Sequence, residues 1–100
     1  MSAGAVFHPG HDELHGMTVV LLTDGPRTYV GRWDSVQDGM IHMVGVSMHE
    51  KDRDQRSRED FLTETKTYGI AVQFPRLTVP EKEVKRVVKL ADIDPTGLAR

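Results

Sequence analysis

The sequence contains no cysteine, which excludes disulfide bonds, thiolate metal sites and cysteine nucleophiles and fits a reducing compartment. No apolar run approaches the ~20 residues of a membrane-spanning helix. Residues 1–16 show neither the basic start nor the long apolar stretch of a secretory signal. We therefore expect a cytoplasmic protein that has no contact with a membrane.

A basic excess is also missing, since 13 lysines and arginines are set against 15 acidic residues and the formal net charge is −2. Proteins that hold nucleic acid through its phosphates usually carry such an excess. RNA binding would require a local patch, or several copies of the chain around one ligand. A basic cluster does occur at Lys82, Lys85, Arg86 and Lys89, but glutamates are interleaved with it. It favours a solvated strand edge over a phosphate contact.

Catalytic motifs are lacking as well. There is no glycine-rich phosphate loop, and "GVSMH" at residues 45–49 lacks the second glycine of a nucleophile elbow. His11 and His15 have the spacing of paired metal ligands on a helix, with His8 and Asp12 nearby, but no rigid element supplies a third ligand. We predict that the protein is not an enzyme and binds neither a cofactor nor a metal.

What is present is the composition of one ordinary globular domain, with 38% apolar and 28% charged residues in a chain of 100. We expect a single domain over residues 1–100, with a flexible N-terminus at 1–10, a barrel at 11–90 and a tail at 91–100. A short N-terminal helix can form near the start of the barrel, capped by Asp12 and ended by Gly16.

Segments with the character of β-strands follow at residues 17–24, 28–36, 40–49, 65–79 and 84–90. Asp24-Gly25 and Asp38-Gly39 predict hairpin turns, the first widened by Pro26. A charged extension of mixed sign occupies residues 49–64. It is consistent with an extension of two strands or with a solvated, partly helical loop.

Gly31 and Gly45 lie inside two of these strands, where glycine favours a bend or a close approach of two backbones. Tyr29 and Trp33 alternate around Gly31, and we expect them to form one packed face; an exposed stacking platform is the alternative. The pattern predicts an all-β fold, a small, strongly bent, five-stranded antiparallel barrel. It also predicts a short N-terminal helix and a charged insertion between strands three and four.

The stretch "DELHGMTVVLLTDGPRTYVGRWDSVQDGMIHMVGVSMHE", residues 12–50, resembles the first motif of the Sm-like family of small β-barrels. That motif has an apolar strand, an Asp-Gly turn, Tyr followed closely by Gly, Asp-x-x-Met-Asn, and an apolar strand that ends near an acidic residue. The matching residues are Asp24, Gly25, Tyr29, Gly31, Asp38 and Glu50.

In that family the Asp and Asn of Asp-x-x-Met-Asn help to grip an RNA base, and the residue before Met stacks on it. The resemblance implies these roles for Asp38, Met40 and His42, with Ile41 in place of the core Met, although three of the four positions depart from the motif. The family alignment buries Ile41 and Met43. The alternation of apolar residues would instead bury the set Met40, His42, Val44, Val46 and Met48.

The family's second motif is Arg-Gly between strands four and five, where the Arg completes the nucleotide pocket. No Arg-Gly occurs in "TVPEKEVKRVV" at residues 78–88, and the nearby cations Arg76, Lys82 and Arg86 do not occupy the motif. The resemblance thus implies the strand architecture more strongly than the RNA pocket.

Two functions follow as hypotheses. The protein forms a homo-oligomeric ring that binds single-stranded RNA at Asp38, Met40 and His42, in the loop between strands two and three. Alternatively, it is a non-enzymatic scaffold or protein-interaction barrel that kept ring assembly and lost the RNA pocket. In both, an open edge, either "TYGIAVQF" or "VKRVVKL", pairs with the next subunit.

Overall fold

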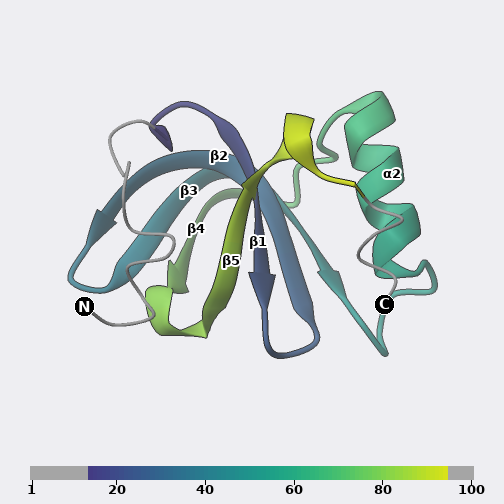
Figure 1. Cartoon of the computed structure of the whole chain (residues 1–100), viewed down its shortest axis with the longest axis horizontal. Helices are drawn as coiled ribbons and strands as arrows, with labels where there is room; N and C mark the ends of the chain where they lie inside the picture. Colours follow the sequence, from purple (N-terminus) through teal and green to yellow (C-terminus); the bar gives the residue numbers. More distant parts are fainter. Residues whose placement is uncertain (1–13, 95–100) are drawn as a thin grey trace.

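The computed structural model describes residues 14–94, in which five strands form one antiparallel sheet (Figure 1). The strands are β1 (Thr18–Thr23), β2 (Arg27–Gln37), β3 (Met40–Glu50), β4 (Phe74–Pro80) and β5 (Val84–Lys89). Their order across the sheet is β4-β3-β2-β1-β5. The predicted all-β fold with five antiparallel strands is confirmed. Most of the predicted N-terminal helix, together with His8 and His11, lies outside the described residues.

The pairing of β2 with β3 is irregular around Gly31, and the sheet bends there. A Cβ added to Gly31 would lie 2.8 Å from Cγ2 of Val46 and 3.3 Å from its Cα, so only glycine fits there without displacing β3. The pairing register shifts between Val30 and Arg32, and Gly45 on the facing strand has a φ of 64°. These features describe a β-bulge, which increases the local twist and bends the strand. Both glycines therefore act as the bend points that the sequence predicts.

The curved sheet encloses the larger of two hydrophobic clusters. Trp33 and Tyr29 are buried in it, which confirms that they share one packed face. The other buried members are Val19, Leu21, Ile41, Met43, Val46, Val79 and Val84. This enclosed side is called the inner face below, and the opposite side of the sheet is called the outer face.

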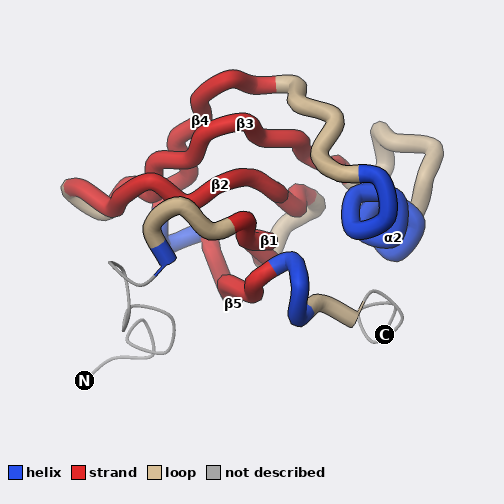
Figure 2. The backbone as a smooth tube through the Cα atoms, turned by 90° about the horizontal axis from the view of Figure 1, so that it is seen from above, coloured by secondary structure: helices blue, strands red, loops and turns tan. Residues whose placement is uncertain are grey.

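A helix, α2 (Arg58–Tyr68), is inserted between β3 and β4 and lies against one end of the outer face (Figure 2). Ser57 begins the helix, because its hydroxyl accepts a hydrogen bond from the Asp60 backbone N–H at 3.0 Å. Phe61 and Leu62 of α2 are buried in the second cluster. Its other buried members are Val20, Leu22, Val30 and Ile93.

The predicted strand at residues 65–73 is wrong, since α2 continues to Tyr68 and β4 begins only at Phe74. Thr65 and Thr67 favour strands by propensity, but the helix that starts at Ser57 buries apolar side chains on the sheet and tertiary packing overrides propensity. Thr65 adapts to the helix, because its hydroxyl donates to the Phe61 carbonyl at 2.8 Å. The charged segment 49–64 thus comprises the end of β3, a loop and half of a helix.

Two short 3₁₀ turns complete the described part of the chain. Glu81–Glu83 connects β4 to β5, and Leu90–Asp92 follows β5. Ile93, in the segment expected to be a tail, is buried in the second cluster. Among the residues that the structure describes, no helix is both long and apolar enough to cross a membrane.

Candidate binding surfaces

The turn between β2 and β3 consists of Asp38 and Gly39 alone, since Gln37 pairs directly with Met40. Both turn residues have positive φ, 54° and 76°, as a type I′ turn requires, and Asp-Gly is a preferred sequence for it. The predicted turn is confirmed. Asp38 is exposed at its tip, but so short a turn forms no extended loop around a ligand.

Met40 and His42 lie in β3 and not in a loop. His42 pairs with Ser35 of β2 and Thr78 of β4. The side chains of Met40 and His42 are half-buried on the outer face. Ile41 and Met43 face inward and are buried, so the register that the family alignment implies is right at this end of β3. The simple alternation fails, because the bulge at Gly45 turns the following residues to the other face.

The end of the outer face that lies away from α2 is covered by none of the described elements. Its residues, here called the open face, are Arg32, Ser35, Gln37, Met40, His42, Val44, Arg76 and Thr78. β3, which lies between β4 and β2, contributes three half-buried side chains, Met40, His42 and Val44. Val44 pairs with Arg32 on one side and with Arg76 on the other. Both arginines are exposed, and within residues 14–94 neither side chain has a hydrogen-bond or ion-pair partner.

The connection between β4 and β5 lies against the β2–β3 turn, since the Glu81 backbone N–H donates to the Gly39 carbonyl at 2.8 Å. The two places where the Sm-like family carries its motifs are therefore adjacent here. The residues that meet at this point include the acids Asp38 and Glu81, and Lys82 follows Glu81 in the connection. This composition opposes the approach of a phosphate.

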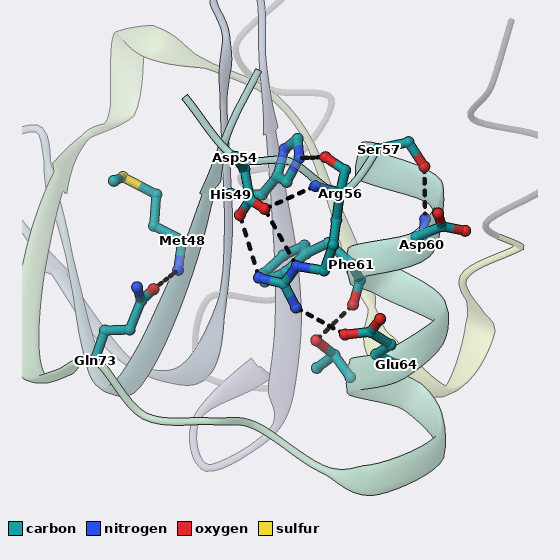
Figure 3. A network of polar contacts seen from close by, with 10 residues as sticks. Met48, His49, Asp54, Arg56, Ser57, Asp60, Phe61, Glu64 and Gln73 are labelled. Carbon is teal, nitrogen blue, oxygen red and sulfur yellow. Dashed lines mark hydrogen bonds and ion pairs between the residues drawn. The ribbon is translucent and has the colours of Figure 1, made fainter. Parts of the chain in front are cut away.

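A polar network joins the end of β3 to α2 (Figure 3). The Arg56 guanidinium donates to Asp54 at 3.2 Å and to Glu64 at 2.8 Å, and it lies 5.3 Å from the centre of the Phe61 ring. These hydrogen bonds lower the pKa of the Asp54 carboxyl and raise that of Arg56. The buried His49 completes the network, because its Nε2 donates to the Arg56 carbonyl at 2.7 Å.

Two shallow hollows border this network, but neither favours one class of ligand. One, of about 610 Å³, lies between Met48, Gln73 and the loop at residues 53–56. The other, of about 600 Å³, lies between the β1–β2 turn and the start of α2. Acids and bases are mixed in both linings, and Arg56, the cation common to them, is engaged by Asp54 and Glu64. We assign the network a structural role, which is to hold α2 on the sheet.

The sheet has two edges, β4 and β5, and within the described residues each pairs on one side only. Of the two predicted edge segments, "VKRVVKL" is confirmed as β5. "TYGIAVQF" supplies only Phe74 to a strand, because its preceding residues lie in α2 and the linker after it. β4 carries Pro75 and Pro80, which have no N–H to donate, whereas β5 contains no proline.

Arg32 was not identified from the sequence as a candidate residue. It stands between Gly31 and Trp33, whose inward direction was predicted, so strand alternation alone places Arg32 on the outer face. Its relation to Arg76 depends on the pairing of β4 with β3 across an inserted helix, and no local pattern in the sequence reveals that.

No protein-family model and no curated protein matches this sequence. Among solved structures, an Sm protein of Pyrococcus abyssii in complex with a uridine heptamer is similar, with a TM-score of 0.53 and 8% identity over 78% of this chain and 89% of that one. A chain of the NatC complex bound to Gag peptide and CoA has a TM-score of 0.51 and 17% identity over 89% and 97%. A chain of the NatC complex bound to CoA has a TM-score of 0.50 and 17% identity over 88% of each chain. At these identities the similarity shows the fold, which is the small Sm-like fold.

Proposed function

We propose that this protein is a non-enzymatic assembly barrel whose edge strands join it to neighbouring protein chains. The observation that carries the proposal is the pair of edges, β4 and β5, each with one partner strand in the described part of the chain. Exposed edges present unpaired backbone groups that other strands can bind. Because the two edges differ, joining one to the other from chain to chain is a heterologous contact, which closes into a ring when the rotation permits.

The similar structures are consistent with this proposal. Two of them are chains of a complex, NatC. A ring made only of copies of this chain is the simplest form of such an assembly, and it is therefore the first form to test.

Lys89→Pro should prevent edge-to-edge association through β5. Lys89 has φ −63°, which proline adopts without strain, and the substitution removes one backbone donor at the end of the strand. In about 1 M salt, where charge repulsion is screened, we expect light scattering of the wild-type chain to give masses that are multiples of 11.2 kDa. The proline variant should be monomeric.

Lys89→Ala is the matched control, because it removes the same charge and keeps the backbone N–H. It should associate as the wild type does. Circular dichroism must show that all three proteins are folded. A wild-type chain that stays monomeric at high micromolar concentration would contradict the ring.

Single-stranded RNA binding is the second candidate function, and the open face is the observation that favours it. Arg32 and Arg76 offer two unpaired cations on either side of Val44, and His42 and Met40 continue the same surface. A histidine ring can stack on a base, and a thioether can lie against one. The Sm protein of Pyrococcus abyssii, which has a similar fold, is bound to a uridine heptamer. The acidic turn at Asp38 and the absent Arg-Gly place this candidate second.

Fluorescence anisotropy with labelled oligo-U tests this candidate. If RNA binds the open face, the double variant Arg32→Ala/Arg76→Ala should weaken binding and lower the slope of log affinity against log salt by about two phosphate contacts. His42→Ala should weaken binding without changing that slope. Lys51→Ala, which removes an exposed cation beyond the end of β3, is the control. Absence of binding at low salt removes this function altogether.

A further inference from the structure

The strand β5 presents its backbone for pairing along the sheet edge. The Trp33 N–H donates to the Met17 carbonyl at 2.9 Å, which sets the phase of hydrogen bonding between β2 and β1. Along β1, the backbone hydrogen-bonding groups of successive residues point alternately to β2 and to β5. The same contact therefore also fixes which residues of β1 are hydrogen-bonded to β5. With the observed register, the backbone groups of Val88 point to β1, and those of Val87 and Lys89 point away from the sheet.

The side chains of β5 give this edge a positive charge. Three of its six residues are Lys85, Arg86 and Lys89, all exposed, and none is acidic. Lys85 lies 3.5 Å from Asp24, an ion pair in which both side chains are largely exposed. Among residues 14–94, the side chains of Arg86 and Lys89 have no hydrogen-bond or ion-pair partner. The edge is thus cationic, although the whole chain has a formal net charge of −2.

The opposite edge does not complement this charge. β4 contains Arg76 and no acidic residue. Joining β4 of one copy to β5 of another brings cations together, and joining two β5 strands does so more strongly. Like charges on facing strands are destabilising, whereas opposite charges on facing strands are stabilising. A copy of this chain is therefore a poor neighbour for β5 at low salt.

We propose that β5 is completed by an acidic β-strand that belongs to a different protein chain. This inference rests on the proposed assembly function and names the chemistry of the neighbour. Its acidic side chains would lie beside Arg86 and Lys89, and its backbone would pair with the outward groups of Val87 and Lys89.

Apolar positions on β5 favour a strand over a nucleic acid as the occupant. Val87 and Val88 are half-buried and extend the inner and the outer cluster, respectively, to the sheet edge. An added strand has side chains on both faces and covers both valines. Neither β4 nor β5 offers an exposed aromatic side chain on which a base could stack.

Three labelled peptides test the inference by fluorescence anisotropy. The first is the six-residue peptide Glu-Glu-Val-Val-Glu-Val, in which two Glu residues three positions apart lie on opposite faces, as Arg86 and Lys89 do. The second replaces Glu with Lys, and the third is the acidic peptide with every second backbone nitrogen methylated. We expect the acidic peptide to bind at least about tenfold more tightly than the other two. Its affinity should fall as salt rises. Arg86→Glu should weaken it by about tenfold, whereas Lys51→Glu, with the same change in charge away from this edge, should leave it unchanged.

The outcomes separate this inference from the proposed function. If the methylated peptide binds as tightly as the acidic peptide, the contact is charge attraction without backbone pairing, and the inference is overturned. Displacement of the acidic peptide by oligo-U would also overturn it. Self-association of the wild-type chain that is as strong at low salt as at high salt would also overturn it, while leaving edge assembly intact. If Lys89→Pro alters neither self-association nor peptide binding, the proposed assembly through β5 is itself wrong.

Discussion

Leu62→Ala should lower the free energy of unfolding by about 2–5 kcal/mol, the range for truncating a fully buried leucine. Leu62 has no exposed surface and lies in the outer cluster with Val20, Val30 and Ile93. The substitution leaves a cavity between α2 and the sheet, which the rigid β-strands cannot close. We expect this effect because α2 is held by packing and has little amphipathic character of its own.

Urea denaturation followed by two probes checks this prediction. Far-ultraviolet circular dichroism reports the helix, and the fluorescence of Trp33, the single tryptophan, reports the inner cluster. Coincident transitions would show that both clusters unfold together. Thr63→Ala, at an exposed position of the same helix, is the control and should stay within about 0.5 kcal/mol of the wild type. Equal stability of the two variants would mean that α2 is not packed as described.

Gly31→Ala should destabilise the protein by about 1–3 kcal/mol, the cost of overpacking a core. The added Cβ would lie 2.8 Å from Cγ2 of Val46 and 3.2 Å from Cε of Met43. Both neighbours are buried, so neither moves freely. The expected sign is unusual, because replacing glycine with alanine at an unstrained position normally stabilises a protein by reducing the entropy of the unfolded chain.

Gly25→Ala provides the matched control for the effect at Gly31. A Cβ at Gly25 meets nothing within 4 Å, and its φ is not positive. It should therefore be neutral or slightly stabilising in the same urea titration. Val46→Ala in the Gly31→Ala background removes the nearest clashing methyl, so the double variant should be more stable than the sum of the two single effects predicts. A strictly additive result would show that Gly31 does not contact Val46.

The sequence revealed those parts of the fold that depend on local chemistry. Asp38-Gly39 satisfies a turn with two positive φ angles, so its residue types alone point to a hairpin. Gly31, between two aromatic residues that face inward, indicated the close approach of β3. The strand at residues 84–89 was likewise visible in the order of the residues.

The parts that depend on contacts distant in the sequence were not accessible. Thr65 and Thr67 favour strands, and only the packing of Phe61 against the sheet explains why they are helical. Simple alternation misassigned His42, because the bulge at Gly45 changes the phase within β3. The predicted residues Asp38, Met40 and His42 are neighbours at one end of the sheet, but only Asp38 is in a loop.

The position of β1 has a consequence for how motion spreads through the molecule. Its residues Val19–Leu22 are buried in succession, alternately in the inner cluster and in the outer one. β1 therefore contributes buried side chains to both hydrophobic clusters and lies between them. β5 is hydrogen-bonded directly to β1. We therefore expect occupancy of the free edge and the packing of α2 to influence each other through these four consecutive aliphatic residues.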